Sequence, residues 1–321
     1  MTLILAIPSK GRLKEQCEAW LADCGFRLEA EGGERGYRAA LAGLPGAEVR
    51  LLSAGDIAAG LDAGELHLGV TGEDLLRERG EGLDERVSLL RALPFGRADL
   101  VVAAPQSWID VETMADVADV AHLHLLRTGA RMRVATKYGV QTRAFFARSG
   151  VSEYRIVESS GATEGAPAAG QAELVVDITT TGSTLAANNL KIVGEGVILR
   201  SRAQLAASLR AGWNAEGLRL ARRLLLAAEA RARGRALAAL RWPPEQAEAA
   251  EAAASPFLGR GAQARSEGLF IPEALVLEVC EALALAQVGP VSVTRPDYVW
   301  EASSPAADGL AERLGISVPA R

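Results

Sequence analysis

Glu164–Leu185 reads EGAPAAGQAELVVDITTTGSTL, and this stretch decides how the chain is interpreted. Its apolar run ends on one acid, Asp177, and then passes through threonines into a glycine and a predicted helix start. A buried strand that stops in such a turn presents backbone N–H groups and hydroxyls to one anion. The predicted phosphate-binding residues are Thr180, Thr181, Gly182, Ser183 and Thr184. Because Asp177 can accept hydrogen bonds from sugar hydroxyls beside them, the stretch indicates a phosphorylated ribose; the alternative is an ordinary turn and helix cap.

The spacing E-x5-G-x-A-x2-V-x-D-I-x2-T-G-x-T-L in this stretch resembles the signature of the ATP phosphoribosyltransferase family, which begins histidine biosynthesis. Other segments resemble the family in the same order along the chain. They are PSKGRL at 8–13, Asp56-Ile57, GVTGEDLL at 69–76 and ATKY at 135–138. The resemblance extends over about residues 3–205. One departure is the stretch Ser53-Ala54-Gly55, where many family members carry an arginine, so Arg50 is the alternative anion contact.

The resemblance implies an α/β catalytic part of two lobes, like a periplasmic binding protein, with ligands in the cleft between the lobes. It also implies a pentosyltransferase reaction with Mg²⁺ as cofactor. In that reaction N1 of the adenine of ATP attacks C1 of phosphoribosyl pyrophosphate (PRPP), and pyrophosphate leaves. N1 already carries a lone pair at neutral pH, so positioning and electrostatic stabilisation matter more than a strong base. The sequence shows no Ser/His/Asp or Cys/His arrangement, which fits this expectation.

Lys10, Arg12, Glu164 and Asp177 are the predicted catalytic residues. Lys10 and Arg12 lie between the first strand and its helix, where the helix N-terminus attracts anions. The resemblance assigns both to pyrophosphate or ATP phosphates; the alternative is two solvated loop charges. Glu164 and Asp177 belong to the matched signature and can bind ribose hydroxyls or the Mg²⁺ shell. We expect pyrophosphate and water to hold the metal, without a dedicated protein cage.

The predicted ATP-binding residues are Asp56, Gly72, Asp74 and Tyr138. Asp56 and Asp74 follow strand ends in lobe one and are expected to face the cleft. The alternative for Asp74 is a simple acid at a helix N-terminus, stabilised by the helix dipole. The resemblance places Tyr138 near the adenine as a stacking or edge contact. A tyrosine at the cleft rim without a ligand is the alternative.

Composition narrows the class of protein. The chain has 321 residues and a net charge of −5 without a long basic block, which disfavours nucleic acid as the main partner. No stretch of about 18 uncharged apolar residues predicts a membrane span, and the first residues predict a strand rather than a signal peptide, so a cytoplasmic location is expected. The cysteines and histidines show neither disulfide nor metal spacing. They are Cys17, Cys24, Cys280, His67, His122 and His124.

Alternating apolar runs and helical stretches predict a βαβ pattern before residue 210. The expected division is lobe one over 1–95 and 181–212, lobe two over 96–180, a helical linker over 213–267 and a candidate regulatory domain over 268–321. We expect the chain to cross between the lobes near Pro94–Asp99 and to return around Thr181–Asn189. This return places the phosphate loop at the hinge, where ligands of open α/β sheets commonly lie.

The last third of the chain predicts one helix over 213–240 and then the order β-α-β-β-α-β over 268–318. The expected strands are 268–271, 291–294, 298–302 and 316–318, and the expected helices are 273–287 and 308–314. This order is ferredoxin-like and resembles the regulatory domain of the long-form enzymes, which implies a homo-oligomer inhibited by histidine. The alternative is an extended short-form enzyme, whose family relatives need a histidyl-tRNA-synthetase-like regulatory subunit.

Two other functions remain compatible with a two-lobed fold. A small-molecule binding module without catalysis shares the cleft, but it has no need for the phosphate loop. A prephenate dehydratase-like enzyme joins a similar cleft to a small regulatory domain, and it also lacks this loop. Both alternatives are therefore less well supported by the sequence than the transferase.

Overall fold

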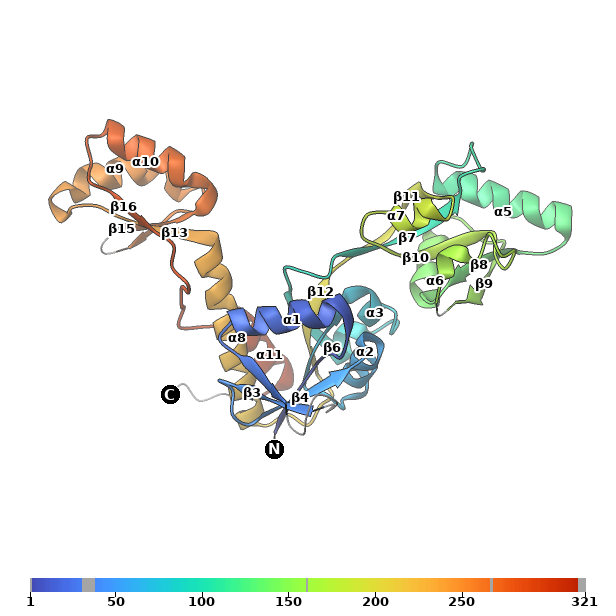
Figure 1. The fold of residues 1–321 in the computed structure, drawn as a ribbon, viewed down its shortest axis with the longest axis horizontal. Coiled ribbons are helices and arrows are strands. Elements are labelled where there is room, and N and C mark those ends of the chain that lie inside the picture. Colours follow the sequence, from blue (N-terminus) through green and yellow to red (C-terminus); the bar gives the residue numbers. More distant parts are fainter. Residues whose placement is uncertain (1, 31–37, 160, 266–267, 317–321) are drawn as a thin grey trace.

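Sheet A of the computed structural model has seven strands in the order β2-β3-β4-β1-β5-β12-β6 (Figure 1). The structure describes residues 2–30, 38–159, 161–265 and 268–316. The strands are β1 (Leu3–Pro8), β2 (Arg27–Ala30), β3 (Arg38–Ala42), β4 (Ala47–Leu52), β5 (Leu68–Gly72), β6 (Val87–Ala92) and β12 (Ala203–Ser208). β1 pairs in parallel with β4 and β5. The turns that follow these three strands therefore meet at one edge of the sheet, where α/β proteins bind ligands.

Helices connect the strands of sheet A, and together they form lobe one. They are α1 (Gly11–Asp23), α2 (Ala54–Ala63), α3 (Glu73–Arg77) and α4 (Leu83–Arg86). The apolar and helical patterns predict strands over 3–7, 49–53 and 66–71 and helices over 13–24, 56–63 and 74–79, and all of them overlap observed elements. Sequence patterns did not predict the β2–β3 hairpin, β6 or β12. β12 reads AQLAAS and is buried at every position, but it lacks the β-branched residues that mark a strand.

Lobe two is built on sheet B, with the strand order β11-β7-β10-β8-β9. Its strands are β7 (Ala98–Pro105), β8 (Met132–Thr136), β9 (Tyr154–Glu158), β10 (Leu174–Thr179) and β11 (Leu190–Ser201). Its helices are α5 (Met114–Thr128), α6 (Gly139–Arg148) and α7 (Ser183–Ala187), with a 3₁₀ turn, η1 (Thr163–Gly165). β10 pairs in parallel with β8, so the turns after both strands lie side by side. These turns contain Tyr138 and the predicted phosphate loop.

Two segments join the lobes (Figure 1). The chain leaves sheet A after β6 and enters sheet B at β7, as expected near residues 94–99. The return expected at 181–189 is wrong, because β11 belongs to lobe two and the chain returns at Arg202. β11 pairs with β7 from Leu190 opposite Pro105 to Ser201 opposite Ala98. The apolar runs at 190–193 and 197–199 predict two short strands, whereas the structure has one strand, β11, interrupted by register shifts.

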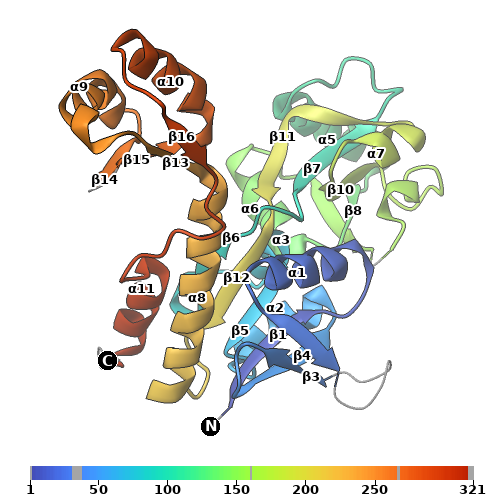
Figure 2. The same ribbon diagram turned by 60° about the vertical axis from the view of Figure 1, so that its left-hand side comes forward.

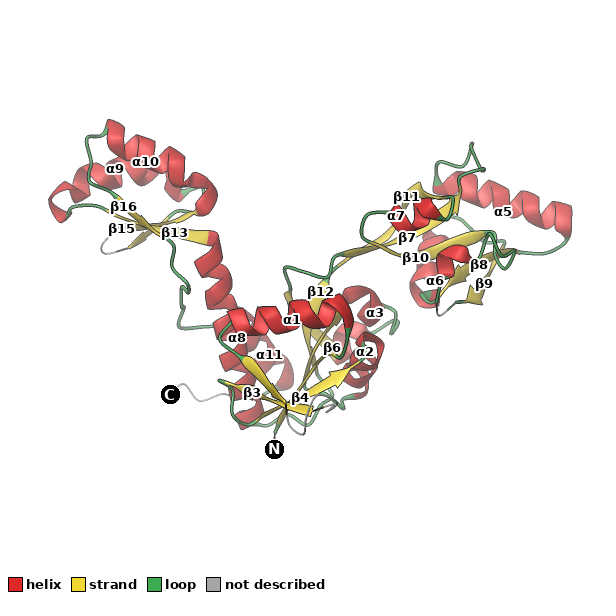
Figure 3. Ribbon diagram, in the orientation of Figure 1, coloured by secondary structure: helices red, strands yellow, loops and turns green. Residues whose placement is uncertain are grey.

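A third sheet, sheet C, has the strand order β14-β15-β13-β16, and all its pairs are antiparallel. The unit, residues 237–294, consists of β13 (Leu237–Arg241), α9 (Ala247–Leu258), β14 (Gln263–Arg265), β15 (Gly268–Pro272), α10 (Val276–Leu285) and β16 (Ser292–Thr294). Both helices cover one face of the sheet (Figure 3). This C-terminal unit therefore has the β-α-β-β-α-β order of a ferredoxin-like fold, and a hydrophobic core of its own.

The β-α-β-β-α-β order was expected over residues 268–318, but the structure has it over residues 237–294. The helix expected to run to residue 240 ends at Ala236, since pairing of β13 with β15 and β16 overrides the helix propensity of Leu and Ala. Within residues 245–268, expected to be a helix and a loose linker, α9 is the helix, but β14 belongs to sheet C. Residues 298–302 form no strand and run along α8, where the N–H of Val299 donates to the carbonyl of Ala230. The strand expected at 316–318 lies almost entirely outside the described residues.

Two C-terminal helices belong to lobe one rather than to a linker or a separate domain. They are α8 (Ala215–Ala236) and α11 (Pro305–Leu314). Figure 2 shows α11 beside α8 and α8 beside sheet A. The lobe-one core contains residues of α8 such as Leu218 and Leu224, together with Ala307 and Leu310 of α11. Any boundary near residue 212 therefore cuts through a single hydrophobic core.

Cys17 and Cys24 are both buried in the lobe-one core, and all three cysteines are free. Burial raises the pKa of the Cys24 thiol to about 12, and the pKa of Cys17 is also raised by burial. Over the described ranges, no helix has the length and apolar character required to cross a membrane.

Candidate functional site

A cleft of about 670 Å³ lies between the two lobes. Lobe one, the segment entering lobe two and lobe two itself all contribute to its wall. Five of the predicted site residues line it: Arg12, Gly72, Asp74, Tyr138 and Thr180. A second hollow of about 470 Å³ lies on lobe two between the 107–111 loop and α5, and it contains no predicted site residue. The interlobe cleft is therefore the candidate site.

The turn between β1 and α1 carries the first two predicted cations. Lys10 precedes α1 in an extended conformation, and Gly11 has a φ of 71°, a left-handed value that glycine adopts without strain. Lys10 and Arg12 are both exposed, and only Arg12 borders the cleft. Neither side chain forms an ion pair with the part of the chain that the structure describes. The turn thus offers positive charge at a helix N-terminus, the arrangement expected for an anion contact.

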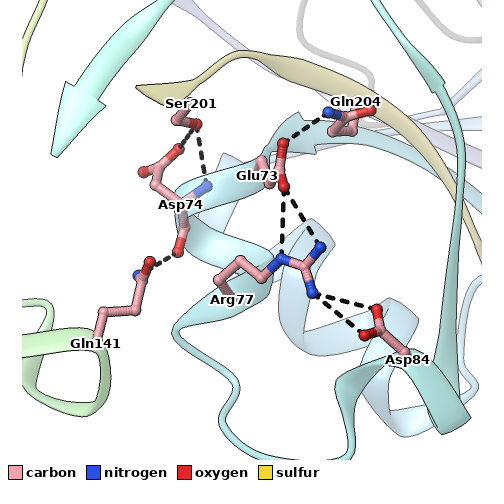
Figure 4. Close-up of polar contacts among 7 residues, drawn as sticks. All are labelled: Glu73, Asp74, Arg77, Asp84, Gln141, Ser201 and Gln204. Atoms are coloured by element: carbon pink, nitrogen blue, oxygen red, sulfur yellow. Dashed lines mark hydrogen bonds and ion pairs between the residues drawn. The ribbon is translucent and has the colours of Figure 1, made fainter. Parts of the chain in front are cut away.

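Asp74 is the centre of a buried network at the start of α3. Its carboxylate accepts hydrogen bonds from Ser201 Oγ at 2.8 Å and from the Tyr138 hydroxyl at 2.7 Å, and its N–H donates to Ser201 Oγ. Figure 4 shows the Ser201 contacts. A Cβ atom at Gly72 would collide with the Asp74 carboxylate, which explains the glycine there. Asp74 therefore does more than cap a helix, since it connects α3 to the end of β11 and to lobe two.

Tyr138 is fully buried, at 0% exposure, so it is not the rim tyrosine considered as the alternative. In this conformation it also offers no free ring face for stacking on adenine. Burial, followed by the charge of Asp74, raises the pKa of the Tyr138 hydroxyl. The hydroxyl consequently stays protonated and donates to Asp74. Tyr138 connects the lobes through its hydrogen bond to Asp74, and the residue borders the cleft.

Two acids of lobe one, Asp56 and Glu73, form hydrogen bonds within that lobe. Asp56 is exposed, its N–H donates to Ser53 Oγ, and its carboxylate accepts from the same hydroxyl at 2.6 Å. This is the cap of α2, and Asp56 is outside the residues that line the cleft. Glu73 accepts hydrogen bonds from Gln204 and Arg77, as Figure 4 shows. The structure therefore gives Asp56 a capping role and does not bring it to the cleft.

The predicted phosphate loop is a tight turn between β10 and α7. Gly182 has a φ of 76°, and its N–H donates to Thr179 Oγ1 at 2.8 Å. The Thr181 and Ser183 hydroxyls lie 2.9 Å apart, and Thr180 Oγ1 donates to the carbonyl of Arg97. The loop is thus held by its own hydroxyls and by the segment that joins the lobes. Thr180 alone borders the cleft, while Thr181, Ser183 and Thr184 are exposed beside it.

Asp177 and Glu164 lie close enough for their charges to interact. Asp177 is half-buried at the end of β10, and its carboxylate accepts from the N–H of Ile178 at 2.8 Å. Burial raises the pKa of Asp177, the hydrogen bond from Ile178 and the charge of Lys137 oppose the shift, and Glu164 adds a smaller increase. The site therefore holds an acid whose charge is costly without a cationic partner.

Two cations that sequence reasoning missed line the cleft: Lys137 and Arg97. Lys137 Nζ lies 5.0 Å from the centre of the Tyr138 ring, and its charge acts on Asp177. Lys137 was quoted within ATKY, and its place at the end of β8, next to β10, is the signal that could have identified it. Arg97 lies in the joining segment, where no sequence pattern marks a ligand contact. With Arg12, these residues give the cleft positive charge from three parts of the chain.

Acids and histidines in the described residues form no cluster of three or more that could hold a metal ion. Asp74 is the only carboxylate among the described residues that line the cleft, and Asp177 and Glu164 lie outside that lining. His67 is buried outside the cleft, where Nδ1 accepts from the N–H of Ile4 and Nε2 donates to the carbonyl of Gly212. Its role is therefore structural.

Comparisons with known proteins agree on one family. The family model described as HisG: ATP phosphoribosyltransferase matches residues 53–225. An ATP phosphoribosyltransferase of Caulobacter vibrioides is 67% identical over 312 residues, which span 97% of this chain and 98% of the relative. That of Nitrobacter winogradskyi is 47% identical over 317 residues, which span 96% and 97%. The solved ATP phosphoribosyl transferase (HisG:HisZ) complex from Thermotoga maritima matches with a TM-score of 0.53 and 26% identity, covering 71% of this chain and 98% of that one.

Proposed function

Because this chain belongs to the ATP phosphoribosyltransferase family, we propose that its interlobe cleft joins ATP to PRPP, giving N1-(5-phosphoribosyl)-ATP and pyrophosphate. The chain is a pentosyltransferase of histidine biosynthesis. Identity of 67% to a transferase over 97% of this chain also argues against the two alternative functions, a binding module without catalysis and a prephenate dehydratase-like enzyme. The cytoplasm is the proposed location, because the reaction consumes ATP.

The single observation that carries the site is the charge of the cleft. Arg12, Arg97 and Lys137 line it from lobe one, the joining segment and lobe two. ATP and PRPP are both polyanions, and cations around a cleft raise the local concentration of such ligands. Arginine also binds phosphate oxygens with two parallel N–H donors. Closing the lobes on these substrates would therefore neutralise charge on both walls.

We assign the 5-phosphate of PRPP to the Thr180–Thr184 loop. The Thr181 and Ser183 hydroxyls now bond to each other, and Thr180 donates to the carbonyl of Arg97, so a bound phosphate would exchange these bonds for its own. Asp177 lies three residues before Thr180, the first residue of the loop, which would place its carboxylate near the ribose. Lys10 and Arg12, across the cleft, are assigned to the pyrophosphate or to ATP phosphates. Gly72 and Asp74 border the proposed ATP side, and Tyr138 joins them.

In the proposed reaction, the lone pair of adenine N1 forms the bond to C1 of the ribose. The bond from C1 to the pyrophosphate oxygen breaks, and pyrophosphate leaves with the electron pair. Positive charge develops on the ribose ring in between, and the carboxylates of Asp177 and Glu164 stabilise it. Lys10 and Arg12 stabilise the charge on the leaving pyrophosphate. The protein thus acts through orientation and electrostatics, without a strong base.

Mg²⁺ is the proposed cofactor, and the residues present fit a metal held mainly by its ligand. Mg²⁺ keeps several waters and commonly uses one or two carboxylates together with substrate phosphates. Asp177 and Glu164 are the carboxylates available for that role. When bound, Mg²⁺ would supply positive charge to the pyrophosphate oxygens.

We propose that the C-terminal unit, residues 237–294, is a regulatory domain that responds to histidine within a homo-oligomer. Its ferredoxin-like order and separate core support this. The second candidate is regulation by a separate subunit, since the Thermotoga maritima protein is a HisG:HisZ complex. The chain of that complex covers only 71% of this one, so the additional sheet favours self-contained regulation.

The proposal is tested with the purified chain alone. Pyrophosphate release and formation of the phosphoribosyl-ATP product are measured with ATP, PRPP and Mg²⁺, with and without histidine. Arg97→Ala is compared with Arg148→Ala, an exposed arginine of lobe two that lies outside the cleft lining. The proposed site predicts weaker binding of both substrates in the first variant only. Equal kinetics in both variants would place the site elsewhere.

A further inference from the structure

A carboxylate from lobe one caps the N-terminus of α6 in lobe two. The residue before α6, Tyr138, supplies no side-chain cap. Instead, the N–H groups of Val140 and Gln141 donate to the two carboxylate oxygens of Glu78, at 2.7 and 3.2 Å. The first N–H groups of a helix lack partners within it, and the helix dipole favours a negative charge there. Glu78, at the end of α3, therefore stabilises a helix of the other lobe.

A second contact strengthens this junction. The side-chain amide of Gln141 donates to the carbonyl of Asp74 at 2.8 Å and to Glu78 at 3.3 Å. Figure 4 shows Gln141 extending from lobe two to Asp74. Together with the Tyr138–Asp74 hydrogen bond, these contacts join α3 to the start of α6. The two lobes thus meet through polar groups on two short segments.

The Glu78 contacts lie at the edge of the junction between the lobes. Val140 is 40% exposed and Glu78 is half-buried, so water reaches this point. Hydrogen bonds at such a place exchange with water when the lobes part. Leu75 of α3 also packs against the lobe-two core, so parting the lobes costs that apolar contact as well. Interactions of this kind bias the equilibrium between open and closed lobes, because they are present in only one of the two states.

We propose that Glu78 is a positioning residue that holds the lobes at the cleft width seen here by capping α6 from α3. Its contacts adjoin both walls of the cleft. Asp74 lies one helical turn before Glu78, while Lys137 and Tyr138 directly precede α6. Loss of the cap would therefore move the proposed nucleotide side away from Lys137. The effect on substrate affinity rests on the proposed function, whereas the effect on lobe separation does not.

The test compares Glu78→Ala and Glu78→Gln with Glu81→Ala. Glu81 is an exposed acid three residues further along, so its replacement makes the same change in net charge. Small-angle X-ray scattering without substrates measures lobe separation, and steady-state kinetics gives KM and kcat. For Glu78→Ala we expect a larger radius of gyration and KM values about tenfold higher, the equivalent of one lost hydrogen bond to a charged group. Glu78→Gln keeps an acceptor oxygen and should give a smaller change in both.

Scattering from Glu78→Ala that matches Glu81→Ala would overturn the inference. Wider lobes with unchanged KM would support the cap and count against the cleft as the substrate site. If Glu78→Ala does not fold, Glu78→Gln is combined with Gln141→Leu in a double-mutant cycle. Additive effects on lobe separation in that cycle would also overturn the inference, because residues joined in one network do not act independently.

Discussion

The hydroxyl of Tyr138, in lobe two, donates a 2.7 Å hydrogen bond to Oδ2 of Asp74, in lobe one. Ser201 donates to the other carboxylate oxygen, so both oxygens of this buried acid have partners. Burial and the nearby carboxylate raise the pKa of Tyr138, which keeps the donating proton in place at neutral pH. One hydrogen bond thus ties the position of lobe two to a side chain of the cleft.

Tyr138→Phe should lower the free energy of unfolding by about 1–3 kcal/mol, because a buried carboxylate oxygen loses its donor. The ring and its packing remain, so the loss reports on the hydrogen bond. Urea unfolding measures it, with Tyr154→Phe as the control, since the Tyr154 hydroxyl has no hydrogen bond within the described residues. Equal stability of the two variants would show that the Tyr138–Asp74 bond contributes nothing net.

Gly182→Val should abolish tight PRPP binding through the backbone. Its φ of 76° is a conformation that side chains with a branched Cβ rarely adopt. Ile192 Cδ1 would lie 3.6 Å from the new Cβ, an ordinary contact, so strain rather than a clash would distort the loop. The control is Gly170→Val, with a similar φ of 66° and open space around it. Titration calorimetry with PRPP should separate the two; comparable affinities would argue against the loop as the phosphate site.

Asp177→Asn should reduce turnover at least about tenfold, the effect of losing roughly one electrostatic contact to developing charge. The same change should stabilise the substrate-free protein at neutral pH. Burial raises the pKa of Asp177, so the folded state holds this carboxylate in an unfavourable charged form at pH 7. An Asp177→Asn protein with full turnover would leave Asp177 as a plain strand-end acid.

The pH dependence of that stability difference has a definite sign. A carboxyl group whose folded pKa exceeds its unfolded value, about 3.9, favours folding below the unfolded pKa. That contribution is lost as the pH rises through the raised folded pKa. The melting temperature of the wild type should therefore fall relative to Asp177→Asn as the pH increases from about 4 towards neutrality. A difference that is constant over this range would contradict the raised pKa.

Lys137→Met should weaken PRPP binding and make the effect of salt smaller, because one exposed cation of the cleft is removed. It should also raise the pKa of Asp177 further, since Lys137 now opposes the effect of burial. Binding is measured at low and high ionic strength, and the carboxyl titration is followed by NMR. The control Lys191→Met removes a cation that donates to the carbonyl of Ile109, away from the cleft. Matching salt dependence in both variants would remove Lys137 from the site.

The sequence predicted those strands best whose own apolar residues mark them as buried. β10 and its turn were identified because Leu174–Val176 is a short apolar run that ends in an acid. β12 was missed, because its alanines form a strand only through pairing with β5 and β6 on both sides. The return to lobe one was misplaced for a related reason, since the β11 sequence gives no sign of its long pairing with β7. Local composition does not predict pairing between strands that are distant in the sequence.

In the site, too, the sequence does not predict side-chain positions that depend on contacts between distant segments. Motif residues near strand ends, such as Arg12 and Thr180, do line the cleft. Tyr138 also lies there, but its burial and its hydrogen bond to a residue 64 positions earlier follow only from the docking of the lobes. Arg97 and Glu78 carry no motif at all, and their positions depend on which segments meet in space.

The last prediction concerns the C-terminal unit, residues 237–294. A truncation after about residue 212, which the sequence suggested, removes α8 and α11 from the lobe-one core and should unfold lobe one. An internal deletion respects the structure better. β13 and β16 pair with Ala239 opposite Thr294, and a Cβ on Gly234 would contact the backbone of Asp297, so the two ends lie together. A short Gly/Ser linker can therefore replace residues 237–294.

This deletion should leave both lobes folded, since sheet C has a separate core, while the truncation after 212 should not fold. If the C-terminal unit is the regulatory domain, the deletion variant keeps phosphoribosyltransferase activity, loses inhibition by histidine and forms a smaller oligomer. Light scattering and a histidine titration on the wild type and the deletion variant measure these effects. An active deletion variant that is still inhibited by histidine would move the regulatory site to the lobes. A variant of unchanged oligomer size would show that the lobes, α8 and α11 hold the subunits together, since those parts alone would remain.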